Sequence, residues 1–150
     1  MEPRIDYYNA SPEVTKAMYG LSRAVNNSGL ERSLLELVKM RASPINGCAY
    51  CIDMHSKDAR AAGETEQRLC ALNAWRETPF FSDRERAALE WTESLTLIAE
   101  NHVPDELFES VRQHFSETEI VNLTFAVAAI NSWNRLAISL RAVPGSYRAD

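Results

Sequence analysis

The 150-residue sequence has few of the features that mark secreted, membrane-embedded or nucleic-acid-binding proteins. It has only three cysteines, an odd number, which argues against a framework of structural disulfides. The 16 Lys and Arg residues are outnumbered by 21 Asp and Glu, so the net charge of −5 disfavours a nucleic acid or an anionic membrane as the main partner. Residues 1–6 have neither the basic start nor the apolar run of a secretory signal. We therefore predict a cytoplasmic protein whose partners are small molecules or other proteins.

The sequence also lacks the alternating Val, Ile and Thr runs that are typical of β-strands. Its apolar residues instead recur at intervals of three and four, the spacing of one helix face. The most apolar segment is interrupted by Asn131, Asn134 and Arg135, well short of the roughly 18 residues that a membrane span needs. The fold class is therefore predicted to be all-α, as one domain over residues 1–150.

Capping signals divide this domain into about six to seven helices. Ser11-Pro12 is typical of a helix start, and Ser82 and Ser116 each precede a Glu three residues later in a capping box. We expect the two chain ends to be flexible, over about residues 1–10 and 146–150. The predicted helices cover about 11–26, 30–42 (ended by Ser43-Pro44), 46 or 47 to 63, 64–75, 82 onward, 104–115 and 116–143.

Two cysteines and a histidine carry the strongest chemical signal in the chain. At about 100° of rotation per residue, Cys48, Cys51 and His55 share one sector of their predicted helix with small apolar residues such as Ala59. A helix start favours a thiolate, because its unpaired N–H groups and its dipole stabilise negative charge. His55 could stabilise that thiolate when protonated or accept the thiol proton when neutral.

Three interpretations of the cysteine pair stay open on these grounds: a redox-active dithiol, a zinc site, or two small core residues. Zinc would need a fourth ligand, and no second Cys-x-x-Cys or His pair supplies one, so we favour the redox interpretation. The third cysteine, Cys70, is expected to be a buried small residue. Polar groups at Asn131, Trp133, Asn134 and Arg135 predict an interhelical or intersubunit network, because buried polar groups must find partners. Contact with substrate is the alternative role for these residues.

Helix geometry alone gives Glu36 no chemical role. In the helix predicted over residues 30–42, Glu36 falls opposite the apolar stripe that contains Leu34 and Val38, and close to Lys39. This position predicts an ion pair on the surface.

The spacing of these residues nevertheless resembles a known signature. Glu36, eleven residues, Cys48-Ala49-Tyr50-Cys51, three residues and His55 together resemble the active-site pattern of the AhpD-like alkylhydroperoxidases, within the carboxymuconolactone decarboxylase superfamily. The resemblance extends over most of the chain, to about Arg135. It implies a helical domain that assembles into trimers or hexamers, with its site near a subunit contact.

The resemblance also implies the reaction, a reduction of hydroperoxides through a dithiol–disulfide cycle. Cys51 corresponds to the thiol that attacks the peroxide and Cys48 to the resolving thiol, while Glu36 and His55 correspond to a proton relay. No bound cofactor and no metal are expected. The implied partners are a small-molecule hydroperoxide and an external dithiol reductant protein, such as one that bears a lipoyl group.

One residue departs from the founding pattern, which has His where this sequence has Tyr50. An unperturbed tyrosine has a pKa near 10 and is a poor proton shuttle at neutral pH. Two other functions therefore remain as alternatives. One is a dithiol–disulfide oxidoreductase without significant peroxidase activity, and the other is a non-catalytic helical oligomer with structural or zinc-binding cysteines.

Overall fold

A computed structural model describes residues 1–149 and confirms the all-α prediction over that range. None of the helices in this described part is long and apolar enough to cross a membrane. The elements are α1 (Tyr7–Ala10), α2 (Pro12–Asn26), α3 (Arg32–Asn46), α4 (Ala49–Ala61), α5 (Glu66–Ala71), the 3-10 helix η1 (Leu72–Glu77), α6 (Asp83–Thr96), α7 (Ile98–Asn101), α8 (Asp105–Arg112) and α9 (Glu117–Leu140).

The helices with predicted capping residues begin as expected, but several helices end at other residues than predicted. Both capping boxes are present, at Ser82 and at Ser116. The stop expected at Pro44 is wrong, because α3 continues through that proline to Asn46 and is capped by Gly47, whose φ of 70° is easily adopted only by glycine. The last helix also ends early, at Leu140 instead of residue 143, because Arg141 takes a left-handed conformation.

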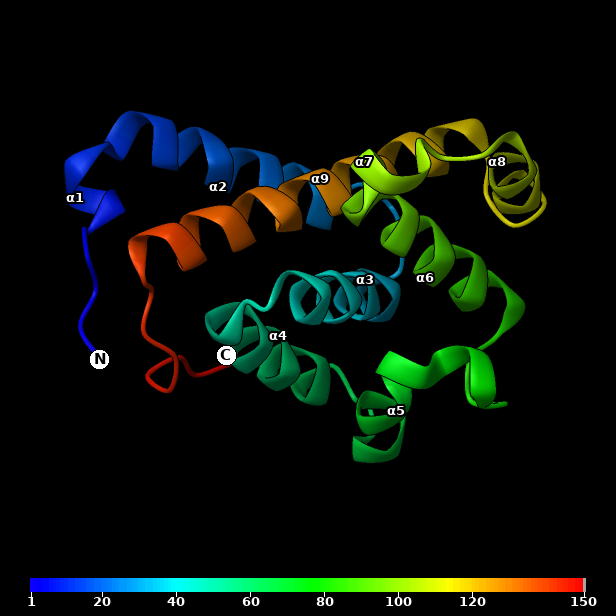
Figure 1. The fold of residues 1–150 in the computed structure, drawn as a ribbon, viewed down its shortest axis with the longest axis horizontal. Helices are drawn as coiled ribbons and strands as arrows, with labels where there is room; N and C mark the ends of the chain where they lie inside the picture. The colour runs from blue at the N-terminus through cyan, green and yellow to red at the C-terminus, as the bar shows by residue number, and fades with distance from the viewer. Residues whose placement is uncertain (150) are drawn as a thin grey trace.

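Helix α3 is the centre of the fold, since α4, α6 and α9 all pack against it. Figure 1 shows α9 running along the length of the molecule with α2 beside it, while α4 lies next to α3 on the other side. Helices α6 and α8 lie at the end of the molecule that is far from both chain termini (Figure 1). A helix with neighbours on several sides has little exposed surface, whatever its own hydrophobic pattern.

The buried side chains form three clusters around α3. The largest joins α3 to α6 and α9, and a second lies beneath α5 and η1. The third holds both cysteines of the pair between α3, α4 and α9. Its buried members are Ala42, Cys48, Cys51, Ile130 and Ala137.

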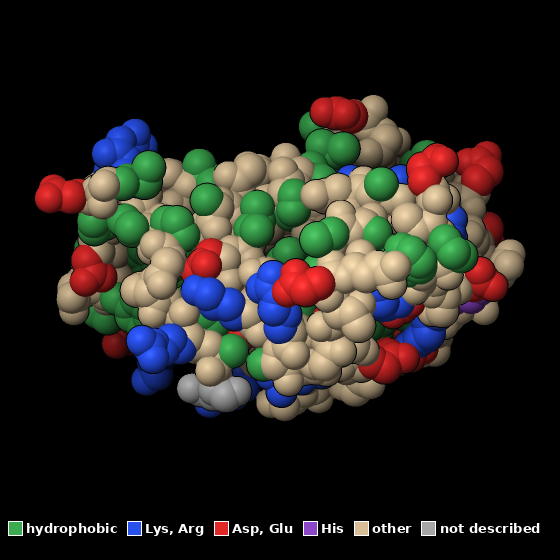
Figure 2. All heavy atoms as spheres, turned by 90° about the horizontal axis from the view of Figure 1, so that it is seen from below, with side chains coloured by type: hydrophobic (Ala, Val, Ile, Leu, Met, Phe, Trp, Pro, Cys, Tyr) green, Lys and Arg blue, Asp and Glu red, His purple; other side chains and the backbone are tan. Residues whose placement is uncertain are grey.

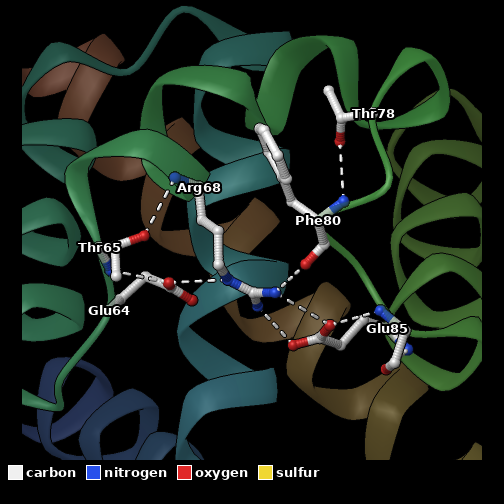
Figure 3. A network of polar contacts seen from close by, with 7 residues as sticks. Glu64, Thr65, Arg68, Thr78, Phe80 and Glu85 are labelled. Carbon is white, nitrogen blue, oxygen red and sulfur yellow. Dashed lines mark hydrogen bonds and ion pairs between the residues drawn. The ribbon is translucent and has the colours of Figure 1, made fainter.

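Arg68 on α5 fixes the segment that leads into α6 (Figure 3). Its guanidinium donates to Glu64 Oε1 at 2.8 Å, to Glu85 Oε1 at 2.5 Å and to the carbonyl of Phe80. Because Arg68 joins three segments, it ties the α5–η1 region to α6.

Cys70 lies on the same helix and is exposed, so the prediction that it is buried was wrong. Helix α5 packs inward through Leu69, and the following 3-10 helix packs inward through Leu72. Cys70 therefore faces outward between these two anchoring positions.

The chain ends are attached to the helices at several points. The Arg4 backbone N–H donates to the carbonyl of Leu140 at 2.9 Å. The Tyr147 hydroxyl donates a hydrogen bond to Asp58 on α4. The flexibility expected for residues 1–10 and 146–150 stays a prediction, and Asp150 lies outside the described residues.

Charged side chains of both signs are interspersed on the face shown in Figure 2. No extended basic patch gathers on that face, and a nucleic acid would need one to bind there.

The central core predicts a clear difference between two truncations. Leu89 on α6 is fully buried, whereas Val14 on α2 is 67% exposed. We expect Leu89→Ala to lower the free energy of unfolding by about 2–5 kcal/mol, because it removes buried contacts and leaves a cavity. Val14→Ala should change it by no more than about 0.5 kcal/mol. Urea denaturation followed by circular dichroism measures both, and equal losses would contradict this packing.

Candidate active site

The two cysteines of the pair lie at the start of α4, in the position that the sequence predicts. Cys48 is the N-cap residue of α4, and the Cys51 N–H donates a hydrogen bond to Cys48 Sγ at 3.4 Å. Their Sγ atoms lie at disulfide distance and their Cα atoms are 5.4 Å apart. Because this Cα separation is typical of disulfides, the pair can interconvert between dithiol and disulfide with little backbone movement. Both residues are buried.

The turn between α3 and α4 holds Cys48 in place. The Cys48 N–H donates to the carbonyl of Ser43 at 2.9 Å, which closes the left-handed turn at Gly47. This turn brings the end of α3 directly to the start of α4, so residues on both helices can share one site.

Side-chain amides attach the same turn to α9. Asn46 Nδ2 donates to Asn131 Oδ1 at 2.9 Å and to Asn134 Oδ1 at 2.8 Å. Asn134 Nδ2 in turn donates to Ser43 Oγ at 3.2 Å, and Arg135 donates to Asn131. The predicted interhelical network is therefore confirmed within one chain.

Glu36 is buried, so its predicted place on the surface was wrong. The helix wheel placed it correctly relative to the apolar stripe, but α4 covers the other side of α3 as well. The predicted ion pair with Lys39 is present, with 2.8 Å between Lys39 Nζ and Glu36 Oε1. The other carboxylate oxygen, Oε2, lies 3.2 Å from His55 Nδ1. The chain itself thus brings Glu36 and His55 together.

A second carboxylate, which sequence reasoning missed, also faces His55. Asp58 Oδ2 lies 3.5 Å from His55 Nδ1, and Asp58 Oδ1 accepts a hydrogen bond from Tyr147 Oη at 2.6 Å. The sequence signal that could have identified Asp58 is its position three residues after His55, because residues three apart on a helix are neighbours. The contact with Tyr147 had no such local signal, since 89 residues separate the two positions.

This environment shifts the pKa of each group toward its charged form. Burial opposes a charge on His55, but hydrogen bonds to Asp58 and Glu36 outweigh it and raise the pKa of His55. Burial likewise disfavours the Glu36 carboxylate, yet His55 and Lys39 lower its pKa. For Asp58, His55 and Tyr147 outweigh burial and lower the pKa. Both carboxylates therefore stabilise the imidazolium form of His55 relative to an isolated imidazole.

A cavity of about 560 Å³ opens beside these groups. Cys51 lines it, whereas Cys48 is not among the described residues that do so. The aromatic part of its wall comes from the four helices α1, α2, α4 and α9 and from the segment after α9. The main polar and aromatic lining residues are Tyr7, Tyr19, Glu36, Tyr50, Cys51, His55, Asp58, Trp133 and Tyr147.

Glu36, His55 and Asp58 each offer one ligand-type atom, and these atoms lie within 4.8 Å of one another. Such a group has the size of a small metal site. Its atoms already satisfy one another, however, because Glu36 pairs with Lys39 and both carboxylates face the same ring nitrogen. We therefore interpret the group as an acid–base network. The two cysteines are not part of it.

Residues 12–94 match the model of the carboxymuconolactone decarboxylase family, a stretch that contains the cysteine pair and both predicted relay residues. The chain belongs to the carboxymuconolactone decarboxylase family. The uncharacterized protein YdfG of Bacillus subtilis is 47% identical over 140 residues, which are 93% of this chain and 95% of YdfG. The alkyl hydroperoxide reductase AhpD of Bradyrhizobium diazoefficiens is 40% identical over 45 residues, 30% of this chain and 25% of that protein.

Solved structures of other proteins share the fold. ATU0492 of Agrobacterium tumefaciens, a protein of unknown function described as a candidate AhpD antioxidant defence protein, is 46% identical, with a TM-score of 0.94. The alignment covers 97% of this chain and all of ATU0492. The debrominase Bmp8 has a TM-score of 0.82 at 20% identity, over 92% of this chain and 74% of its own. At that identity the likeness concerns the fold alone. The predicted AhpD-like fold is therefore confirmed.

The charged network of this family member predicts how stability depends on pH. An imidazole in the unfolded chain has a pKa of about 6.5, and the folded protein raises it. The stabilisation by His55 is therefore fully present below about pH 6.5 and is lost as the pH rises through the folded pKa. Urea unfolding of wild type and His55→Gln should show a larger difference in unfolding free energy at about pH 5.5 than at about pH 9.

His114→Gln serves as the control for this measurement, because His114 lies in the turn after α8, outside the lining of the cavity that contains Cys51. A wild-type advantage over His55→Gln that grows toward pH 9 would contradict the described network.

Proposed function

We propose that this protein is a thiol-dependent peroxidase that reduces hydroperoxides through a Cys48/Cys51 dithiol–disulfide cycle. One observation carries the proposal: Cys51 lines a cavity that also contains Glu36 and His55, while Cys48 lies outside that lining at disulfide distance. A hydroperoxide entering the cavity would meet Cys51 first. This arrangement supports Cys51 as the attacking thiol and Cys48 as the resolving thiol.

In the first step, the Cys51 thiolate attacks the distal oxygen of the hydroperoxide. The O–O bond breaks, the sulfur becomes a sulfenic acid, and the leaving alkoxide takes a proton from the relay and departs as an alcohol. Two features support His55 as the donor. It lies one helix turn after Cys51 in the same cavity, and its neighbours favour the imidazolium. The imidazole regains its proton when the Cys51 thiol, regenerated at the end of the cycle, ionises, and the Glu36 carboxylate stabilises the charged ring.

In the second step, the Cys48 thiol displaces the hydroxyl group of the Cys51 sulfenic acid. A disulfide forms, and water leaves with the Cys48 proton. An external dithiol, such as a lipoyl group, then reduces the disulfide by two thiol–disulfide exchanges and is itself oxidised to a disulfide. The cycle uses no bound cofactor and no metal. A cytoplasmic location, where reductants keep thiols reduced, fits this cycle and stays a prediction.

Two cysteine variants test the order of these steps. We expect Cys51→Ser to consume no hydroperoxide, because the attacking sulfur is gone. Cys48→Ser should react once and keep a sulfenic acid on Cys51, because no resolving thiol is present. Stopped-flow peroxide consumption and mass spectrometry after dimedone trapping measure these outcomes. Cys70→Ser, which removes the exposed third thiol, is the control and should behave as wild type.

Dimedone on Cys48 in the Cys51→Ser variant, with full consumption of peroxide, would reverse the assigned roles. A wild-type rate no faster than that of free cysteine would contradict the peroxidase function.

Tyr50 favours a second candidate function, that of a dithiol–disulfide oxidoreductase. It lines the cavity at the position where the founding pattern has a second histidine. Reduction of the Cys48–Cys51 disulfide by dihydrolipoamide, together with a slow reaction of the dithiol with peroxide, would favour this function. A disulfide that no dithiol can reduce would exclude both candidates and leave the non-catalytic or zinc-binding oligomer, which metal analysis tests.

We also propose that the protein forms a homo-oligomer, a trimer or hexamer as the resemblance implies. Exposed apolar side chains on α9 support this assembly: Val121 and Phe125, which are one turn apart near the start of the helix, are 53% and 51% exposed, and Ile138 near its end is 47% exposed. Such a surface is typical of a contact between chains.

Light scattering coupled to gel filtration tests this assembly. Phe125→Glu should lower the molar mass of the assembly, because a buried unpaired carboxylate would disfavour the contact. Val14→Glu changes an exposed apolar residue on α2 and should leave the molar mass unchanged. A monomeric wild type would contradict the proposal.

A further inference from the structure

The chain segment after α9 returns to the candidate active site. Figure 1 shows this C-terminal segment (red) running back from the end of α9 to lie beside α4. Tyr147, on this segment, lines the same cavity as Cys51 and His55. The cavity therefore includes a residue that lies 92 positions after His55 in the chain.

Three hydrogen bonds hold this segment along α4. The Gly145 N–H donates to Asp53 Oδ2 at 3.0 Å, and Lys57 Nζ donates to the carbonyl of Tyr147 at 3.0 Å. Tyr147 Oη donates to Asp58 Oδ1 at 2.6 Å. The first two bonds fix the backbone on both sides of residue 146, and the third directs the phenol toward Asp58.

Asp58 is thereby shared between the C-terminal segment and His55. One of its carboxylate oxygens accepts from Tyr147, and the other lies 3.5 Å from His55 Nδ1. Glu36 Oε2 lies 3.2 Å from the same nitrogen. A ring nitrogen that faces two carboxylates must carry a proton, since neither carboxylate can donate one in its charged form. The second ring nitrogen, Nε2, is then the atom left to exchange protons.

We propose that Asp58 and Tyr147 are positioning residues that hold His55 by its Nδ1 side, so that the C-terminal segment is part of the candidate active site. This inference rests on the proposed function, because it assigns to His55 the proton exchange with substrate. Tyr147 fixes the Asp58 carboxylate, and Asp58 together with Glu36 fixes the tautomer and orientation of the ring.

Other groups around the cavity also affect the titration of His55. The charged ones are Glu36, with Lys39 paired to it, and Arg32 at the start of α3. The other titratable groups that line the cavity are Tyr7 of α1, Tyr19 of α2, and Tyr50 and Cys51 of α4. Of these side chains, Glu36 is the one within hydrogen-bond distance of the His55 ring. A substitution at Asp58 therefore removes one carboxylate near the ring and leaves the contact between Glu36 and His55 in place.

The direct test is the titration of the His55 imidazole by nuclear magnetic resonance in the full-length, disulfide-bonded protein. The His55 signals are assigned by their loss in His55→Gln. We expect Asp58→Asn to shift the titration midpoint to lower pH, because a neutral amide no longer stabilises the imidazolium. Tyr147→Phe should shift it in the same direction by less, because Asp58 keeps its charge but loses the partner that orients it.

Asp105→Asn is the matched control, because it removes an exposed carboxylate on α8 and should leave the midpoint at the wild-type value. A wild-type midpoint in Asp58→Asn overturns the proposal. A wild-type midpoint in Tyr147→Phe alone overturns the part assigned to the C-terminal segment. Circular dichroism melts of the variants identify any loss of fold.

The titration of His55 is measured in the disulfide-bonded protein and needs no peroxide. The positioning role of Asp58 and Tyr147 can therefore be contradicted independently of the proposed peroxidase function, and the reverse. A wild type that reduces hydroperoxides, with no effect of Asp58→Asn on the His55 midpoint, contradicts the positioning role alone. A shifted midpoint in a protein that does not react with hydroperoxides supports the positioning role and contradicts the proposed function.

Discussion

The contact between His55 and two buried carboxylates is the constraint on which the rest of the candidate site depends. Burying one charged group without a partner would cost several kcal/mol, so α3 and α4 are held where Glu36, Lys39, His55 and Asp58 satisfy one another. The same pairing of helices sets the position of Cys51, because it lies one turn before His55. The contacts that hold α3 against α4 therefore also set the positions of the groups in the candidate site.

The cysteine pair is asymmetric in a way that follows from the turn between these helices. Cys48 caps the start of α4 and is packed beneath α9, whereas Cys51 is one turn further on and reaches the cavity. The helix-start argument by itself would favour Cys48 as the reactive thiolate, since its sulfur lies closest to the unpaired N–H groups. Access to the cavity instead favours Cys51, and a substrate must reach the sulfur that it oxidises.

Much of the fold could be predicted from the sequence, because capping boxes and helical periodicity are local signals. Ser82 and Ser116 begin their helices as expected. Glu36 shows the limit of such signals, since its burial depends on α4 covering a face that its own helix pattern marks as polar. For Cys70 the error is the reverse: the residue was expected to be buried and is exposed, because a small apolar residue on a short helix can face outward.

The candidate site was predictable as a set of residues but not as a geometry. Family spacing identified Glu36, Cys48, Cys51 and His55, although the helix wheel alone would have dismissed Glu36. Contacts made across the chain, such as that of Tyr147, leave no periodic signal in a single sequence. Physical reasoning from one helix at a time therefore finds the cysteine pair and His55, but it misses Glu36 and the residues that surround them.

The most direct test of the central claim is to add one equivalent of cumene hydroperoxide to the fully reduced wild-type protein and to map the sulfurs by mass spectrometry. The account predicts a disulfide between Cys48 and Cys51, with Cys70 unmodified although it is the exposed thiol. Oxidation of Cys70 in preference to the pair, or recovery of all three thiols unchanged, would contradict it.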